Sequence, residues 1–377
     1  MNNQNIYLSD ITYDAEEEKA VLEVLRSRWL TMGEVTKTFE KEFGDYIDSP
    51  HVMAVSNCTA ALHLALIALG ISDGDEVIVP SFTFVATSNA VRYTGAAPVF
   101  ADIKSLDDWT ISPDSIRQLI TNRTRAVIVV HYGGYPCDMQ AIMDIAKEHN
   151  LYVVEDAAHG PGSWIGSRHI GTWGDAGCFS FFSNKNMTSG EGGAIVANNE
   201  EIAERIKKLR SHGMTTVSWD RHHGHAYQYD VVSLGYNYRF DELRAALARV
   251  QLKKLDLNNR KRAERHAYYR DLLRNVSGVS IPFAQRGDKV SYHLLSVLLG
   301  ENTDRLDLMK KMRSFGIQTS VHYPPIHHFS NYRDIKTAPL PNTEIVGGRE
   351  LTLPLHPMLA LKDIEYVVQK LKECIPQ

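Results

Sequence analysis

The chain has 377 residues, of which 44% are hydrophobic and 23% are charged, and this composition excludes a disordered, collagen-like or coiled-coil protein. A chain of this length is expected to form one large domain and one smaller domain. The formal net charge is −4 and the basic residues are scattered, so we expect no nucleic-acid partner.

The sequence carries no signal for a membrane or for export. Residues 1–9 are polar and lack the basic start and apolar core of a secretory signal. The longest apolar run, 60–69, is interrupted by His63 and is far shorter than the roughly 20 residues that span a bilayer. The four cysteines include no Cys-x-x-Cys pair, which favours a reducing compartment. We therefore expect a cytoplasmic protein.

The predicted elements begin with an amphipathic helix, because apolar side chains recur at helical spacing at Val35, Phe39, Phe43 and Tyr46. From residue 59 to 198, helical patterns alternate with short β-branched runs, which is typical of an α/β domain with a mostly parallel sheet. The predicted strands cover 76–79, 98–103, 126–131, 151–155, 177–182 and 194–197, and the predicted helices cover 85–93, 113–121 and 138–149.

A long helix is predicted next, with Asp241 as its cap and charged residues that continue it through Arg270. The remaining residues mix a strand at 292–298 with helices at 304–315 and 362–374. We therefore expect a large domain at residues 1–255, with its N-terminal helical segment, and a small C-terminal α/β domain at residues 256–377.

Two residues that follow strands are candidates for chemistry. Asp156 ends an apolar strand, and ligands of open α/β sheets lie at the carboxyl ends of strands, although an aspartate there can also be a turn residue. Lys185 lies between the aromatic run 178–182 and the glycine turn 190–193. Such surroundings would desolvate an amine and lower its pKa, which is what a Schiff-base lysine requires.

A candidate anion site lies at 55–62, where small polar residues directly precede a helical stretch. Backbone N–H groups and the helix dipole would converge there on a phosphate, although a plain N-cap by Ser56 or Thr59 explains the same pattern. No Walker A lysine motif and no G-x-G-x-x-G follows a strand, so nucleotide hydrolysis and dinucleotide redox chemistry lose their usual support.

The order and spacing of these motifs resemble the DegT/DnrJ/StrS family of sugar aminotransferases, a branch of the fold-type I enzymes that use pyridoxal 5'-phosphate (PLP). The resemblance covers nearly the whole chain, in the stretches 29–39, 55–64, 80–89, 155–159, 178–193, 235–252 and 322–333. It implies the fold-type I architecture, with a large domain built on a mostly parallel sheet flanked by helices.

The resemblance also implies a role for each matching residue. Lys185 would form the Schiff base with PLP and move the substrate proton, and Asp156 would pair with the pyridine nitrogen. His159 stands where the family often has a glutamine on the phenolic oxygen of the cofactor, and it can still donate a hydrogen bond. The phosphate would be held by Cys58, Thr59, Ala60 and Ser180, and Phe84 would stack on the cofactor ring.

Two further segments carry expectations about partners. Asn237 and Arg239 resemble a pair that reaches into the neighbouring subunit, Asn237 towards phosphate and Arg239 towards a substrate carboxylate, which implies a homodimer with shared sites. A structural role for Arg239 at the dimer interface explains the segment equally well. His322 and His327 are expected substrate contacts, or else packed residues of a proline-stiffened turn. The histidines of 222–225 lie in a polar stretch that predicts a mobile loop, and we expect no metal ion.

The expected reaction is transfer of an amino group from an amino acid, by resemblance L-glutamate, to the ketone of a nucleotide-linked deoxysugar. Such amino sugars feed surface glycans, such as the O-antigen of lipopolysaccharide, or glycosylated natural products. A PLP-dependent sugar dehydratase, a cyclitol aminotransferase and a non-catalytic regulator or scaffold are the alternatives. Resembling dehydratases carry histidine in place of Lys185, and a non-catalytic relative would be expected to lose Lys185 or Asp156.

Overall fold

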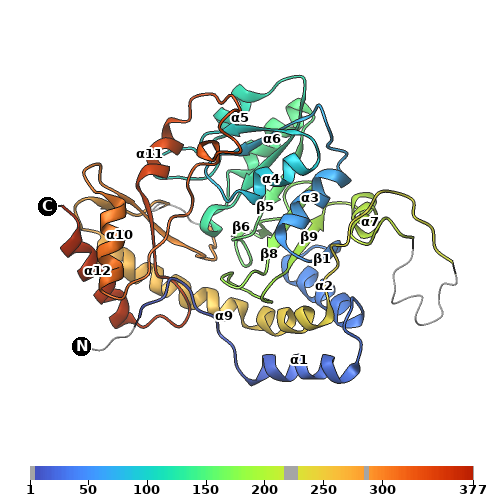
Figure 1. Cartoon of the computed structure of the whole chain (residues 1–377), viewed down its shortest axis with the longest axis horizontal. Helices are drawn as coiled ribbons and strands as arrows, with labels where there is room; N and C mark the ends of the chain where they lie inside the picture. Colours follow the sequence, from blue (N-terminus) through green and yellow to red (C-terminus); the bar gives the residue numbers. More distant parts are fainter. Residues whose placement is uncertain (1–4, 216–227, 284–287, 377) are drawn as a thin grey trace.

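The computed structural model describes residues 5–215, 228–283 and 288–376. Its centre is a seven-stranded sheet with the strand order β1-β9-β8-β5-β4-β2-β3, and every strand except β9 runs parallel to the others (Figure 1). The strands are β1 (Val52–Val55), β2 (Glu76–Pro80), β3 (Ala97–Ala101), β4 (Thr124–Val130), β5 (Tyr152–Asp156), β8 (Ala176–Ser180) and β9 (Gly193–Ala197). The predicted α/β class with a mostly parallel sheet is confirmed.

Helices cover both faces of this sheet, because alternate strand residues point to opposite faces. Val77 and Val79 pack on the layer of α3 (Cys58–Ala68), α4 (Ala86–Tyr93) and α7 (Glu200–Leu209). Ile78 packs on the other face against α5 (Pro113–Leu119) and α6 (Met139–His149). On that same face, the phenylalanines of α2 (Glu34–Ile47) pack on the β1-β9-β8 end of the sheet.

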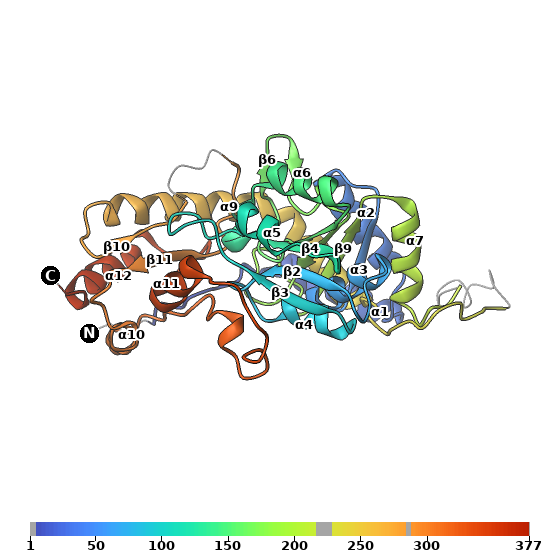
Figure 2. The ribbon, with the colours of Figure 1, turned by 90° about the horizontal axis from the view of Figure 1, so that it is seen from above.

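The helix α9 (Glu242–Leu273) links the main sheet to the C-terminal part of the chain (Figures 1 and 2). Its cap is Asp241, as predicted, and it packs against α1 (Ala15–Ser27) and α2. The carboxylate of Glu242 accepts hydrogen bonds from the backbone N–H groups of Gly33 and Thr36, at 2.8 and 2.9 Å. It thereby caps α2, whose own N-cap residue offers no side-chain oxygen.

A second sheet, with the antiparallel order β10-β11-β12, forms the small C-terminal core with the end of α9, α10 and α12. Its elements are β10 (Val279–Ser280), β11 (Leu295–Leu299), β12 (Glu350–Leu353), α10 (Arg305–Ser314) and α12 (Leu361–Cys374). Ile6, near the N-terminus, is buried in the same core. Because α9 runs through residue 255, the boundary expected between the two domains stays a prediction.

Shorter elements complete the described part of the chain. They are the ribbon of β6 (Trp164–Ile165) and β7 (Arg168–His169), the 3-10 turns η1 (Tyr132–Gly134) and η2 (Ile326–His328), and α11 (Pro341–Arg349). Within the described residues, no helix combines the length and apolar character needed to cross a bilayer. The predicted loop with the histidines of 222–225 lies outside the described residues.

Candidate active site

The carboxyl ends of the parallel strands meet at one edge of the main sheet, and a cavity of about 300 Å³ lies there. Strands of a parallel sheet place the residues that follow them at this edge, which is where open α/β sheets bind ligands. Most of the site residues predicted from the sequence line this cavity: Cys58, Thr59, Phe84, Asp156, His159, Ser180, Lys185 and His322.

Asp156 is the last residue of β5 and is 6% exposed. The hydroxyl of Thr87 donates to its Oδ2 at 2.8 Å, and the backbone N–H of Ala158 donates to its Oδ1 at 3.2 Å. Burial raises the pKa of Asp156 above its ordinary value, and these two hydrogen bonds act in the opposite direction. The carboxylate is therefore fixed in orientation at the wall of the cavity.

Lys185 lies in the loop that follows β8, where its backbone N–H bonds to the carbonyl of Phe182 at 2.9 Å. Burial lowers the pKa of Lys185 to about 8, although the charges of Asp156 and Cys58 raise it. About a tenth of this amine is therefore uncharged and nucleophilic at pH 7, far more than for an ordinary lysine.

The N-terminus of α3 forms the wall expected to bind an anion. Its N-cap is Asn57, rather than Ser56 or Thr59, and the Oδ1 atom of Asn57 accepts the N–H of Ala60 at 2.8 Å. Ala60 does not line the cavity and its N–H already has a partner, so Cys58 and Thr59 stay the candidates on this helix for binding an anion.

A glycine allows this close packing at the end of α3. Gly193 opens β9, pairs with Val55 and Ser180, and lies under the peptide that enters the helix. A Cβ atom on Gly193 would lie 2.7 Å from the carbonyl carbon of Asn57 and 2.8 Å from the backbone nitrogen of Cys58. Only glycine fits there without displacing backbone, so Gly193 helps to set the position of the helix N-terminus.

His159 and Tyr323 form a second wall of the cavity. The backbone N–H of Gly133 donates to Nδ1 of His159 at 3.1 Å, so Nδ1 carries no hydrogen. Burial is the main cause that holds the pKa of His159 well below its ordinary value, so the ring is neutral and its hydrogen is on Nε2. That nitrogen lies 3.1 Å from the hydroxyl of Tyr323, so His159 donates a hydrogen bond to Tyr323 at the wall of the cavity.

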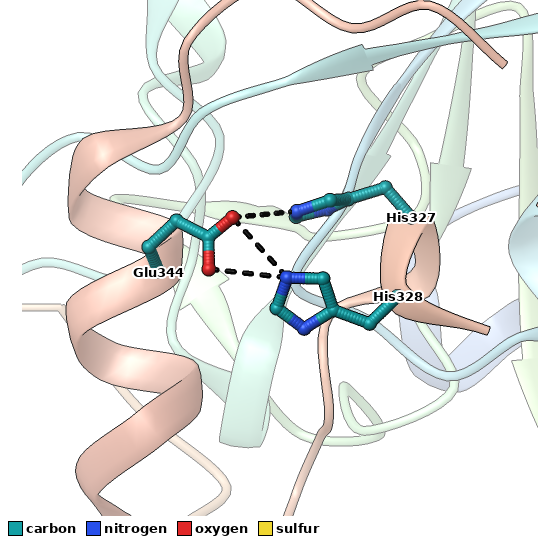
Figure 3. Close-up of side chains that lie close together, drawn as sticks. All are labelled: His327, His328 and Glu344. Carbon is teal, nitrogen blue, oxygen red and sulfur yellow. Dashed lines mark hydrogen bonds and ion pairs between the residues drawn. The ribbon is translucent and has the colours of Figure 1, made fainter. Parts of the chain in front are cut away.

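The two expected substrate histidines lie in different places. His322 lines the cavity, and burial lowers its pKa to about 4. His327 is directed elsewhere: its Nδ1 lies 2.6 Å from the hydroxyl of Ser81, and its Nε2 lies 2.8 Å from Glu344 (Figure 3). His327 does not line the cavity, and its direct contact with a substrate stays a prediction.

His328 joins this group, because its Nε2 lies 3.1 Å from the second carboxylate oxygen of Glu344 (Figure 3). The three side chains fasten η2 to α11. Their ligand atoms lie within 4.8 Å of one another, and among the described residues this is the group whose side chains could hold a metal ion. The hydrogen bonds account for the arrangement without an ion.

Asn237 and Arg239 do not line the cavity of their own chain. Arg239 forms a backbone bridge with Val55 at the end of β1, and Asn237 forms one with Ser211. The segment just before them exposes apolar side chains to solvent, with Leu234 85% exposed and Val231 55% exposed. An exposed apolar segment of this kind is a feature of surfaces that contact another protein.

Several residues of the site were missed in the sequence. Thr87, Tyr323 and Glu191 either line the cavity or hold residues that do. Thr87 lies in a predicted helix, four residues after Thr83, and the two hydroxyls lie 3.1 Å apart. This spacing of one helical turn was the local signal that could have pointed to Thr87. Tyr323 stands next to His322 but carried no signal of its own, because its partner His159 is far away in the sequence.

The class of protein follows from the main sheet and from the groups at its edge, which are the carboxylate of Asp156, the amine of Lys185 and the N-terminus of α3. They define a transferase of the fold-type I architecture used by PLP-dependent aminotransferases. The profile of the DegT/DnrJ/EryC1/StrS aminotransferase family matches residues 12–372, and the chain belongs to this family. It is 39% identical to the uncharacterized protein MJ1066 of Methanocaldococcus jannaschii, over 96% of this chain and 95% of that protein. It is 38% identical to the spore coat polysaccharide biosynthesis protein SpsC of Bacillus subtilis, over 96% of this chain and 94% of SpsC.

Solved structures agree with this assignment. PseC of Helicobacter pylori, an aminotransferase involved in the biosynthesis of pseudoaminic acid, superimposes with a TM-score of 0.92 at 31% identity, over 99% of both chains. DesI, solved in the presence of its TDP-sugar product, gives 0.90 at 31% identity, over 98% of this chain and 93% of DesI. Spr1654 of Streptococcus pneumoniae, solved in its PLP form, gives 0.90 at 27% identity, over 98% of both chains.

Proposed function

We propose that the protein is a PLP-dependent aminotransferase that moves an amino group from L-glutamate to the ketone of a nucleotide-linked deoxysugar. One observation carries this proposal furthest: Lys185, with its lowered pKa, and the buried carboxylate of Asp156 face one cavity beside the N-terminus of α3. The sugar aminotransferases among the structural relatives support the substrate class.

The residues of the cavity fit PLP in kind. The carboxylate corresponds to the pyridine nitrogen of the cofactor, and the amine corresponds to its aldehyde. The anion site corresponds to the phosphate, and the aromatic ring corresponds to the ring face. Asp156 would hold the ring nitrogen, and Cys58, Thr59 and Ser180 would hold the phosphate. Phe84, which lines the cavity and is 55% exposed, would lie against the ring face.

When bound, the cofactor would supply an electron sink for the pair of electrons released as the substrate loses its α-proton. Lys185 would accept that proton at Nζ, because its amine is partly uncharged near neutral pH. It would then return the proton to the cofactor. Asp156 would keep a negative charge against the ring nitrogen. Nε2 of His159, which donates to the hydroxyl of Tyr323 in this structure, would donate instead to the cofactor and so orient the ring.

The sugar would enter from the side of His322 and Phe84, which line the cavity. We extend the proposal to a homodimer in which Asn237 and Arg239 complete the site of the partner subunit. The exposed apolar residues of 231–234 support this arrangement, because a partner would cover them.

Amino transfer is tested with the purified full chain in two half-reactions. L-glutamate should convert the cofactor to its amine form. The absorbance of the cofactor bound to the lysine should then disappear. A panel of nucleotide keto sugars, with a cyclitol ketone as comparison, should then restore the original absorbance. Restoration by the cyclitol but by no nucleotide sugar would overturn the substrate class, and no response to any amino acid would overturn amino transfer.

A further inference from the structure

Behind Lys185 lies a chain of three buried polar side chains that do not border the active-site cavity. They are Asn259 of α9, Asn186 in the loop of Lys185, and His293, which precedes β11. Each is at most 6% exposed. Polar groups buried to this degree are expected to be fully hydrogen-bonded, so the direction of each bond can be worked out.

Two backbone carbonyl groups fix that direction, since a carbonyl oxygen can only accept. Nδ2 of Asn259 donates to the carbonyl of Pro161 at 2.9 Å, which leaves Oδ1 of Asn259 as an acceptor. Nδ2 of Asn186 donates to that oxygen at 2.8 Å and to the carbonyl of Ser291 at 2.7 Å. Oδ1 of Asn186 is therefore directed towards Nδ1 of His293, at 3.0 Å.

This arrangement determines the tautomer of His293. Oδ1 of Asn186 cannot donate, so Nδ1 of His293 must carry a hydrogen. Burial first, and then the charge of Lys185, holds the pKa of His293 well below its ordinary value, so the ring is neutral. Nε2 therefore keeps a bare lone pair. It lies 3.5 Å from Nζ of Lys185, which always has a hydrogen to donate.

His159 has the opposite tautomer, and the two rings lie against each other with centroids 4.4 Å apart. Both are held by Gly133, whose N–H donates to His159 Nδ1 and whose carbonyl accepts the backbone N–H of His293 at 2.9 Å. The pair thus has one Nε2 donor, directed to Tyr323, and one Nε2 acceptor, directed to Lys185.

We propose that His293 is a positioning residue for Lys185: its Nε2 lone pair, fixed by Asn186 and Asn259, accepts a hydrogen bond from the lysine amine. The contact holds Nζ in place whenever it is not bonded to the cofactor and favours its protonated form. The tautomer and the contact follow from the fold alone, whereas the role of Lys185 in proton transfer rests on the proposed function. The other groups that face Lys185 are Asp156, Cys58, His159 and His322.

The tautomer is tested by ¹⁵N NMR of the cofactor-free full chain, labelled on the histidine ring nitrogens. The His293 signals, assigned by their loss in His293→Gln, should show a protonated Nδ1 and a bare Nε2 from pH 6 to 8. A protonated Nε2 in the wild-type protein would overturn the proposal. This measurement requires no variant to be active.

The contact with Lys185 is tested by the pH midpoint at which its amine becomes reactive, followed by acylation and peptide mapping. His293→Phe keeps a ring but removes the lone pair, so the midpoint should fall by about half a unit or more, or about threefold in reactive amine at pH 7. His293→Gln, whose side-chain carbonyl can face Nζ, should restore part of the shift. An unchanged midpoint in a folded His293→Phe protein would overturn the contact.

Asn258 provides a matched control on the same helix. It is 4% exposed and donates to the hydroxyl of Thr12 at 2.9 Å, away from the chain that ends at Lys185. Asn259→Ala should broaden or shift the His293 ¹⁵N signals and lower the Lys185 midpoint, whereas Asn258→Ala should leave both unchanged. Equal effects of the two substitutions would mean that the hydrogen-bonded series from Asn259 to His293 only stabilises the fold, and would contradict its role in positioning Lys185. Borohydride reduction of the loaded protein separates the hypotheses, because cofactor on another lysine contradicts the proposed function and leaves the tautomer result intact.

Discussion

Lys185 shows how the surroundings of one side chain convert a common surface residue into a reactive one. Its pKa is lowered to about 8, because burial outweighs the favourable charges of Asp156 and Cys58. In the cofactor-free protein we expect acylation of Lys185 to rise through a midpoint near pH 8, whereas an ordinary lysine titrates at about pH 10.4. Mass spectrometry of peptides gives the rate for each lysine, and the exposed lysines of the same digest are the internal control.

The same residue should carry the cofactor. Borohydride reduction after loading with PLP should add the pyridoxyl mass to Lys185, and Lys185→Ala should lose activity by several orders of magnitude. A label on any other lysine would contradict this assignment.

Asp156 gives a second prediction for a single residue. Asp156→Asn should still fold and bind the cofactor but should slow proton removal by about 10²-fold or more, because the ring nitrogen would lose its charged partner. The substitution also removes a charge that raises the pKa of Lys185, so the acylation midpoint of Lys185 should move below that of the wild-type protein. Near-normal half-reaction rates would mean that the ring nitrogen has another partner.

The sequence predicted the residues of the site that belong to motifs and missed those defined by tertiary contact. Asp156, Lys185 and Thr59 were found because strand ends, glycine turns and helix starts leave local signals. His293 was missed because its partners Asn186 and Asn259 are distant in the sequence, and no local pattern joins them. The helix start near residue 58 was predicted, but the plain cap considered there was Ser56 or Thr59 and not Asn57, since the polar residues near a helix start have similar capping propensities.

At the level of elements, the long helix and all the strands of the main sheet except β1 were predicted near their observed places. The helix after Asp241 was predicted because its cap and its length gave independent signals. The strand β1 has only four residues and is buried on both faces, so it showed no alternation and was missed. The strand predicted to start at Tyr292 begins at Leu295 instead, because residues 291–293 bond to the loops around Gly133 and Ser163.

The junction of β9 with α3 gives a prediction for an element. Gly193→Ala places a Cβ atom against the backbone of Asn57 and Cys58, which should cost about 1–3 kcal/mol of unfolding free energy and weaken cofactor binding by displacing the helix N-terminus. Urea denaturation and a PLP titration measure the two effects.

Gly348→Ala is the matched control for this change. Gly348 lies in α11 and is exposed, and a Cβ atom added there would have no other atom within 4 Å, so the alanine should be neutral or stabilise the helix by up to about 1 kcal/mol. Cofactor affinity should not change. Similar losses in both variants would argue against a special role for the β9–α3 junction.

At the level of the whole molecule, the shared site predicts complementation between inactive chains. Lys185→Ala and Arg239→Ala should each be nearly inactive, but a co-refolded mixture should recover about a quarter of the wild-type activity. Half of the dimers are then mixed, and one of their two sites contains intact Lys185 and the partner's intact arm. Activity of the mixture is compared with both parents after mixed dimers are demonstrated by mass spectrometry. A mixture as inactive as its parents would place Arg239 within its own site or in folding alone.

The helix α9 has a consequence for the chain lengths that this fold tolerates. Glu242 at its start caps α2, Asn259 in its middle connects to His293, and Tyr269 near its end is buried in the small core. An inserted residue between these positions would rotate everything beyond it by about 100° and advance it by about 1.5 Å. The two cores would then no longer have the relative orientation that these contacts require. Insertions and deletions should therefore be tolerated in surface loops but not within this helix. The length of α9 thus sets the distance between the two cores.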